Sequence, residues 1–367
     1  MERGSGGARP GVSRRALLGM GAAALGSAAG GMALAACGQG AGTGGPSPAG
    51  GTPGAGGGLK PLKVQFLWIK NVEFGGEWIA DADGLYRQEG VQPEFLAGGP
   101  NVDGVAVVSA GGADVGLTGG FAELLDANAK GSDFVAFAAA FQRSPGGILS
   151  LAQNPVNRPG DLLKKRIGGQ EGARIAVNAV LKLNGLEQDY SWIPVGFDPQ
   201  PLIEGACDAY TCYVTNQPLV LAEKNIPYAA VTYSDLGFVS YGNVFFAKRA
   251  VLKEKRDTIV RYLRATIMGW ELNARDPAKA ARLAVEKYGQ DLGLGLSQQI
   301  EQNKAQLALI ESDVTKAKGL FWMDAERISG PIYKALEATG RTRLPKVEDF
   351  VDFSILQDAY GGKTKLT

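Results

Sequence analysis

From residue 60 to residue 154, the sequence alternates short runs rich in β-branched and aromatic residues with stretches of helical periodicity. This alternation constrains the fold more than any other feature, because strands separated by helices of roughly 10 to 15 residues form right-handed βαβ units. The strand-like runs are 62–69, 91–97, 113–119, 133–142 and 146–154, and the helical stretches include 74–88, 101–110 and 120–130. We therefore predict an α/β fold with a mainly parallel sheet.

The same rhythm returns after residue 165, and the chain becomes almost wholly helical from residue 248 onward. We predict two α/β lobes, with lobe 2 inserted into lobe 1, and a helical C-terminal part that packs mainly on lobe 1. Lobe 1 would comprise residues 59–150 and 245–367, and lobe 2 residues 151–244. Two crossing strands, near 148–156 and 238–247, would form the hinge between them.

The first 58 residues have the features of an export and anchoring segment. A paired arginine in SRRALLG and an uncharged, small-residue stretch after it are typical of a twin-arginine signal peptide over residues 1–37. A transmembrane anchor is the alternative, which the weakly apolar Ala and Gly content disfavours. The stretch ends in LAAC, which resembles the bacterial lipoprotein box and implies a lipid on Cys37. Residues 38–58 hold eleven glycines and three prolines, which predicts a flexible tether for a domain held at the outer face of the cell membrane.

The charge balance and the absence of histidine exclude several functions. Thirty-eight basic and 37 acidic residues leave a net charge of +1 without a long basic run, so we expect no nucleic-acid partner. A chain without histidine lacks the Ser/His and Cys/His catalytic pairs and imidazole metal sites. A catalytic role would have to rest on carboxylates, lysine or a cofactor. We expect no metal, no cofactor and no enzymatic activity. Ligand binding should change little between about pH 6 and 8, because no unperturbed side chain titrates there.

Polar and aromatic side chains follow the predicted strands at their carboxyl ends, where open α/β sheets bind ligands. These loops contain Trp68, Asn71 and Phe74, then Thr118, Gly119 and Gly120, then Gln142, Arg143 and Ser144, then Gln170, Glu171 and Gly172, then Asn216 and Gln217, and finally Tyr241 and Asn243. Aromatic faces that stack and amides that both donate and accept fit a flat heterocycle. Two alternatives stay open: Trp68 as a core residue, and Asn71 and Asn216 as helix N-caps.

Glu171 opens a predicted helix from residue 171 to residue 184, where a carboxylate stabilises the helix dipole. If that helix end faced the ligand, the carboxylate would repel an anion. The position therefore favours a neutral or cationic ligand rich in N–H groups.

Cys207 and Cys212 are the two cysteines outside the lipoprotein box. A disulfide between them is chemically allowed outside the cytoplasm, but twin-arginine export follows folding, so the sequence leaves the pairing open.

The order of several motifs carries a resemblance to a known family. EFGGEWIADADGLYRQEGV, FAAAFQRSPGGILS, GGQEG and YVTNQP follow one another between residues 60 and 250. This order resembles the substrate-binding proteins of ABC importers in the thiamine-pyrimidine-precursor group, close to the nitrate, sulfonate and taurine binders. The resemblance implies a type II periplasmic-binding-protein fold, and it implies ligand contacts from Trp68, Asn71, Phe74, Gln142, Ser144, Glu171, Tyr213, Asn216 and Asn243.

The resemblance also implies a function and its partners. We expect a lipid-anchored monomer that captures a small aromatic heterocycle and passes it to a permease and its ATPase. A binder of sulfonate, taurine or nitrate is the first alternative, supported by Arg143 and Ser144. An extracytoplasmic enzyme of the same fold is the second, although the superfamily's pyrimidine-forming enzymes use a histidine and a cysteine-rich motif that this chain lacks.

Overall fold

The structure, a computed structural model, describes residues 58–99 and 102–367. The expected signal peptide, Cys37 and the tether up to residue 57 lie outside the described residues. Among the helices of the described part of the chain, none has the length and apolar character that a membrane span requires.

The first of two sheets contains strands β1 (Lys60–Gln65), β2 (Val91–Leu96), β3 (Val115–Thr118), β4 (Phe134–Phe141) and β10 (Gly242–Lys248). Their order across the sheet is β2-β1-β3-β10-β4. Strand β1 pairs in parallel with β2 and β3, as βαβ units require, whereas β10 is antiparallel to both of its neighbours. Every residue of β4 is buried, so this strand lies inside the core of the lobe.

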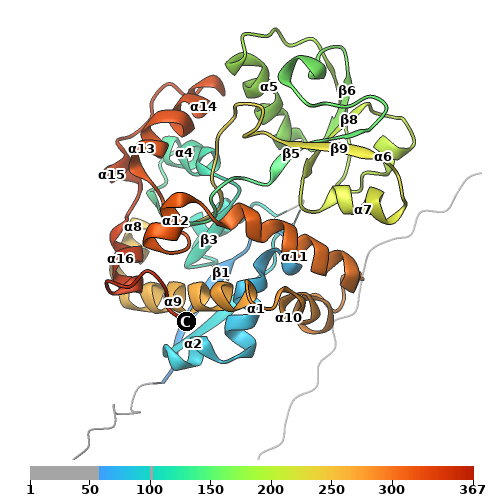
Figure 1. The fold of residues 1–367 in the computed structure, drawn as a ribbon. Helices are drawn as coiled ribbons and strands as arrows, with labels where there is room; N and C mark the ends of the chain where they lie inside the picture. The colour runs from blue at the N-terminus through green and yellow to red at the C-terminus, as the bar shows by residue number, and fades with distance from the viewer. Residues whose placement is uncertain (1–57, 100–101) are drawn as a thin grey trace, which may run out of the picture. The chain divides into compact units, whose positions relative to one another are not determined.

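The second sheet contains β5 (Gly146–Leu151), β6 (Arg166–Gly169), β7 (Ser191–Pro194), β8 (Ala209–Tyr213) and β9 (Tyr228–Thr232). Their order is β7-β6-β8-β5-β9, with β6 parallel to β7 and β8, and β5 antiparallel to β8 and β9. The two-lobe α/β fold is thus confirmed (Figure 1). The sheets are more mixed than expected, because β5 and β10 each enter from the other lobe and run against their neighbours.

The chain crosses between the sheets twice, after β4 and after β9. The first crossing, residues 142–145, precedes the expected hinge at 148–156, and the expected boundary at residue 150 falls inside β5. Pro145, which has no N–H for a strand ladder, lies in the gap between the predicted strand runs 133–142 and 146–154, where the chain crosses from β4 to β5. The second crossing, residues 233–241, leads into β10, which contains the expected boundary at 244.

The helical stretch expected at 74–88 is divided in the structure. Strand β1 ends at Gln65, and a 3-10 turn, η1 (Val72–Phe74), leads into α1 (Gly75–Ala82). Gly84 then adopts a left-handed conformation, with φ of 73°, before α2 (Leu85–Gln88). A residue with a side chain is disfavoured in that conformation, so the glycine ends the helix.

The remaining segments of the two lobes connect the strands as expected, with boundaries that move by a few residues. They are α3 (Gly104–Ser109), α4 (Phe121–Ala129), η2 (Pro159–Leu162), η3 (Glu171–Ala173), α5 (Arg174–Leu183), α6 (Gln200–Ile203) and α7 (Gln217–Glu223).

The C-terminal part is helical, as predicted. It contains α8 (Arg249–Glu254), α9 (Arg256–Asn273), α10 (Pro277–Leu283), η4 (Ala284–Tyr288), α11 (Leu296–Ile310), α12 (Asp313–Lys318), α13 (Ala325–Arg327), η5 (Ile328–Ile332), α14 (Tyr333–Ala338), α15 (Val347–Phe350) and α16 (Ser354–Tyr360). Most of these helices pack on lobe 1, while α14 also contacts α5 and α11 contacts α7 of lobe 2.

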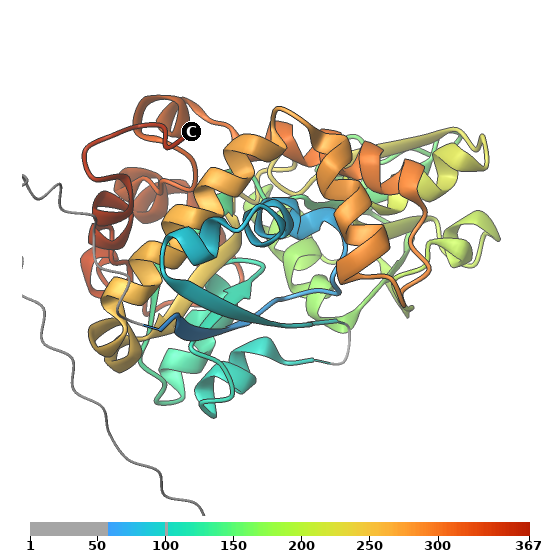
Figure 2. The ribbon, with the colours of Figure 1, turned by 90° about the horizontal axis from the view of Figure 1, so that it is seen from below.

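The longest helix, α9, crosses α1 at very short range (Figure 2). A Cβ atom on Gly76 would lie 2.1 Å from the Trp270 ring, and one on Gly269 would lie 2.1 Å from the Gly76 carbonyl oxygen. The absence of side chains at both positions therefore lets the two helices touch, and this contact fixes the segment that leaves β1.

Candidate functional site

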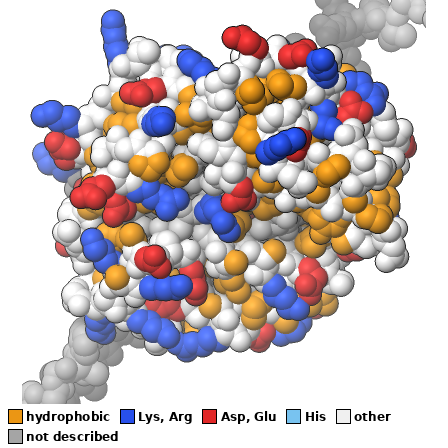
Figure 3. All heavy atoms as spheres, turned by 45° about the horizontal axis from the view of Figure 1, so that its top comes forward, with side chains coloured by type: hydrophobic (Ala, Val, Ile, Leu, Met, Phe, Trp, Pro, Cys, Tyr) orange, Lys and Arg blue, Asp and Glu red, His pale blue; other side chains and the backbone are white. Residues whose placement is uncertain are grey.

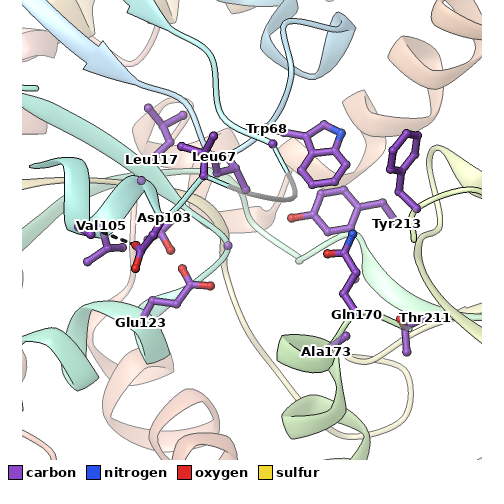
Figure 4. Close-up of a pocket in the computed structure, with 18 of the residues that line it drawn as sticks. Leu67, Trp68, Asp103, Val105, Leu117, Glu123, Gln170, Ala173, Thr211 and Tyr213 are labelled. Atoms are coloured by element: carbon purple, nitrogen blue, oxygen red, sulfur yellow. Dashed lines mark hydrogen bonds between the residues drawn. The ribbon is translucent and has the colours of Figure 1, made fainter. Parts of the chain in front are cut away.

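A pocket of about 1020 Å³ lies between the two lobes. Its walls come from the segments that follow β1, β2 and β3 in lobe 1 and β6 and β8 in lobe 2. The sequence predicted the site at all of these strand ends except that of β2. Figure 4 shows Trp68, Tyr213 and Gln170 together on one side of it, and Asp103 and Glu123 on the other. The volume is at the upper end of the range of about 300–1,000 Å³ that ligand pockets span.

The lobe 1 wall is acidic. Glu73, Asp103, Glu123 and Asp126 line it, whereas Lys130 is the one cationic side chain among the described lining residues. Asp103 also caps α3, where its Oδ1 accepts a hydrogen bond from the Ala106 N–H at 2.9 Å. An inorganic or sulfonate anion would therefore meet mainly carboxyl groups.

Glu73 is the most deeply buried of these acids, with 2% of its surface exposed. Its Oε1 has no hydrogen-bond partner in the structure. Burial raises the pKa of Glu73 from 4.5 to about 7, against a smaller lowering by a hydrogen bond with the Asn243 side chain. A carboxyl group with this pKa changes charge near neutral pH, so the expectation of pH-independent binding loses its basis.

Glu123 opens into the same pocket and differs from Glu73 in its contact with water. Enclosure raises the pKa of Glu123, while a backbone hydrogen bond from Gly119 lowers it less. The side chain nevertheless keeps accessible surface toward the cavity. Water in the pocket therefore screens the Glu123 carboxylate more than the Glu73 carboxylate, and Glu73 is the group whose titration should matter most.

The lobe 2 wall is aromatic and amide-rich. Tyr213 reaches toward lobe 1, and burial followed by the charges of Glu73 and Glu123 raises the pKa of its hydroxyl. The side chain of Gln217 fixes the backbone here, because its Oε1 accepts a hydrogen bond from the Tyr213 N–H at 2.9 Å. Phe197, half exposed, meets Trp68 of lobe 1 edge to face, with ring centroids 6.2 Å apart. These two rings bring the lobes together at the pocket.

Three of the nine predicted contact residues line the pocket: Trp68, Tyr213 and Asn216. Asn216 is the N-cap of α7, but its side chain makes no capping hydrogen bond. A fourth, Glu171, begins η3 between the lining residues Gln170 and Ala173, and its side chain lies outside the description. The structure thus brings together predicted positions from both lobes.

The other five predicted residues do not line the pocket. Asn71 caps η1, as the alternative proposed, and its Oδ1 accepts a hydrogen bond from the Glu73 N–H at 2.9 Å. Phe74 stacks on Phe66 in the core, at 4.0 Å between centroids. Asn243 is buried next to Glu73, with a positive φ of 45°.

Gln142 and Ser144 lie in the first crossing between the lobes. The Gln142 Nε2 donates to the Ala139 carbonyl at 3.2 Å, and its Oε1 accepts from the Ser312 hydroxyl at 3.1 Å. The Ser144 hydroxyl accepts from the Gly146 N–H at 3.3 Å. Both side chains therefore shape the hinge.

Arg143 was the main support for an anion ligand. Its guanidinium lies 3.8 Å from the Asp235 carboxylate, in a partly exposed ion pair, and the residue does not line the pocket. The described residues contain no group of three or more His, Cys, Asp or Glu side chains that could hold a metal ion. The geometry thus favours a ligand that brings hydrogen-bond donors or positive charge.

Cys207 and Cys212 are both buried and both free thiols. The sequence left open whether Cys207 and Cys212 form a disulfide, and in the structure they do not. Burial raises the pKa of both thiols, which holds them protonated and unreactive.

Glu73 and Glu123 are the functional candidates that sequence reasoning missed. Glu73 stands between Asn71 and Phe74, and Glu123 follows β3 in the first turn of α4. The rule that ligands lie at strand ends reaches both loops. The rule does not say which side chain of such a loop faces the pocket. In the loop after β1, the packing of Phe74 into the core decides that Glu73 does so.

A comparison with known families and proteins shows the family of this chain. A family model described as NMT1/THI5 like matches residues 71–280, which is more than half of the 367 residues. The riboflavin-binding protein RibY from Chloroflexus aurantiacus is 23% identical over 277 residues, or 73% of this chain and 78% of that protein.

Two solved structures show the fold. The periplasmic aliphatic sulphonate binding protein SsuA from Escherichia coli matches with a TM-score of 0.61 and 15% identity, covering 80% of this chain and 92% of that one. The periplasmic nitrate-binding protein NrtA from Synechocystis PCC 6803 matches with a TM-score of 0.56 and 12% identity, covering 84% and 92%. The predicted periplasmic-binding-protein fold is thereby confirmed.

Proposed function

The chain belongs to the NMT1/THI5-like family, and we propose that it is the extracytoplasmic solute-binding component of an ABC importer that captures a small aromatic heterocycle between its lobes. The observation that carries this proposal is the composition of the pocket. Aromatic and amide side chains from lobe 2 face carboxyl groups from lobe 1 across a cavity of about 1020 Å³.

A flat ring with N–H groups satisfies both walls. Trp68 and Tyr213 offer ring faces, and stacking adds about 0.5–1.5 kcal/mol beyond the buried area. The carboxyl groups accept hydrogen bonds or pair with positive charge. The volume exceeds what a single pyrimidine ring fills, so a larger heterocycle, such as thiamine or the flavin that the relative RibY is named for, belongs among the candidates.

The ligand proposal is tested by calorimetry on the full chain in detergent. The panel contains 4-amino-5-hydroxymethyl-2-methylpyrimidine, thiamine, riboflavin, taurine and nitrate. One of the three heterocycles should bind with one-to-one stoichiometry, and at 100 times its dissociation constant it should stabilise the folded state by about 2.7 kcal/mol. Tight binding of taurine or nitrate with none of the heterocycles, or turnover of a heterocycle, would favour the alternatives.

The cellular location is part of the same proposal. A twin-arginine signal followed by a lipid on Cys37 and a Gly/Pro-rich tether would hold the domain at the membrane, where it delivers ligand to a permease and ATPase as a monomer. Substitution of Cys37 by Ala should move the protein from the membrane fraction to the soluble extracytoplasmic fraction. Retention of the C37A chain in the membrane would contradict the lipid anchor.

A further inference from the structure

Among the buried polar atoms that have no hydrogen-bond partner in the described residues, three lie close together: Glu73 Oε1, Thr118 Oγ1 and Asn243 Oδ1. The three residues are 2%, 1% and 1% exposed. Buried polar atoms are nearly always paired, because an unpaired one loses its hydrogen bonds to water without compensation. Several such atoms at one place therefore indicate a group that the protein binds rather than a feature of its packing.

The three atoms belong to one place in the fold. Val244 pairs with Thr118 across the β10–β3 ladder, so Asn243 at the start of β10 lies beside the end of β3. The Asn243 side chain lies near enough to Glu73 to lower the pKa of its carboxyl. Glu73 and Thr118 both line the pocket.

The backbone of Asn243 supports a specific role for this side chain. Its φ of 45° is a left-handed conformation, which is uncommon outside glycine and which asparagine tolerates better than most residues. Glycine would serve equally well if only the turn mattered. The residue present instead carries an amide whose oxygen is buried without a partner next to Glu73.

We propose that Glu73 and Thr118, with Asn243 buried next to Glu73, form a subsite that accepts hydrogen bonds from the N–H edge of a nitrogen heterocycle. The inference rests on the proposed function and specifies how the ring is recognised. The Glu73 carboxyl oxygen and the Thr118 hydroxyl oxygen, both unpartnered and both at the pocket, match adjacent donor positions on a flat ring, such as an amino group beside a ring nitrogen. A carboxyl group with a pKa of about 7 can share one proton with that nitrogen, so the pair forms with the proton on either partner.

The subsite is built entirely by lobe 1, from η1, β3 and β10. A ligand can therefore be recognised by lobe 1 before lobe 2 covers it. Tyr213 is placed to do the covering, since it lines the same pocket and feels the charge of Glu73. The N–H edge would be read by lobe 1 and the ring face by lobe 2.

Matched probes test the inference on the full chain without any substitution. The first pair is 4-amino-5-hydroxymethyl-2-methylpyrimidine and the analogue whose amino group is replaced by methyl, a group of similar size that donates no hydrogen bond. The second pair is riboflavin and 3-methylriboflavin, in which the ring N–H is blocked. Calorimetry at pH 7.5 should show that the parent of at least one pair binds at least about tenfold more tightly than its analogue, because the analogue leaves buried acceptors unpaired.

Two variants assign that discrimination to Glu73. Glu73→Met removes the carboxyl at similar volume and should bring parent and analogue to within about threefold of each other. Glu77→Gln is the matched control, because Glu77 is equally buried one turn later but does not line the pocket, and glutamine can still accept the hydrogen bond from the Trp270 indole. This control should keep the wild-type discrimination.

The outcomes separate the two proposals. Equal binding of parent and analogue to the wild type, or unchanged discrimination in Glu73→Met, overturns the subsite while leaving the proposed function intact. If neither parent binds at all, the proposed function fails and the inference fails with it. If Glu73→Met does not fold, Thr118→Val takes its place, and the comparison of probes on the wild type decides by itself.

Discussion

The two walls of the pocket differ in chemistry. The lobe 1 wall holds four carboxyl groups and a buried, unpaired acceptor on Thr118, whereas none of the described lobe 2 side chains that line the pocket is charged. The lobes have closely similar sheets, each with one antiparallel strand that enters from the other lobe. The difference therefore lies in the loops, and it suggests that lobe 1 selects the ligand while lobe 2 supplies contact area. The following predictions test that division.

The largest effect is expected from the aromatic side of the pocket. Tyr213→Ala removes a ring that faces lobe 1 and should weaken heterocycle binding by about 2–3 kcal/mol, or roughly 30- to 150-fold. Because the missing ring is contact area rather than a selective group, the preference for a parent heterocycle over its N–H-blocked analogue should remain. Calorimetry with both probes measures the two effects together.

Tyr228→Ala is the control for that substitution. Tyr228 is 37% exposed on β9 of the same lobe and does not line the pocket, so the affinity should stay at the wild-type value. If Tyr213→Ala binds as tightly as Tyr228→Ala, lobe 2 does not contribute contact area through this residue.

The acidic side of the pocket should make the binding of a cation depend on pH. Burial raises the pKa of Glu73 to about 7, so its carboxyl is mostly neutral at pH 6 and ionised at pH 8. Thiamine carries a permanent positive charge, and its affinity should rise by up to about tenfold from pH 6 to pH 8, since one proton is linked to binding. A flat profile, measured by titration calorimetry, would mean that Glu73 stays in one charge state across this interval.

Glu73 and Glu77 allow a finer comparison within one segment. The Glu77 Oε2 accepts a hydrogen bond from the Trp270 Nε1 at 2.9 Å, and burial raises its pKa to about 8. The folded state then keeps the Glu77 proton, whereas the unfolded state releases it near pH 4.5. The contribution of Glu77 to the free energy of unfolding is therefore greatest below pH 4.5 and declines toward pH 8. Each group contributes at most about 1.4 kcal/mol per pH unit to that decline.

Substitution of Glu77 by Gln should therefore reduce the number of protons linked to unfolding by about one, so that the free energy of unfolding falls less steeply as the pH rises. Chemical denaturation at pH 5, 6, 7 and 8 measures the slope, with Asp257→Asn as the control, because Asp257 is exposed and pairs with Arg261 on the surface of α9. An unchanged slope in E77Q would show that Glu77 is already ionised in the folded protein.

The sequence predicted the fold better than it predicted the site, for a physical reason. Periodicity spans many residues, so it revealed both lobes, although the first crossing lies before the predicted hinge and Gly84 divides a predicted helix. A site depends on which of several adjacent side chains faces the cavity. In the segment after β1, Asn71 caps a turn and Phe74 enters the core, which leaves Glu73 toward the pocket.

The surface seen in Figure 3 has no feature of a polyanion-binding protein. On the face seen in Figure 3, basic and acidic side chains are interspersed, as the net charge of +1 implies. That face has no large patch of a single charge sign that would attract a charged polymer.

The smallest effect is expected where the two walls touch. Trp68 of lobe 1 and Phe197 of lobe 2 meet edge to face at 6.2 Å, and Phe197 is 54% exposed. In the double-mutant cycle of Trp68→Ala and Phe197→Ala, the coupling energy for ligand binding should be about 0.5–1 kcal/mol, because such ring pairs add little beyond their buried area. Trp68→Ala alone should cost more than Phe197→Ala, since both rings line the pocket but Trp68 keeps less of its side chain in solvent. Additive losses, with no coupling energy, would show that the lobes close on the ligand without help from the Trp68–Phe197 contact. The two walls would then act independently at the mouth of the pocket as well.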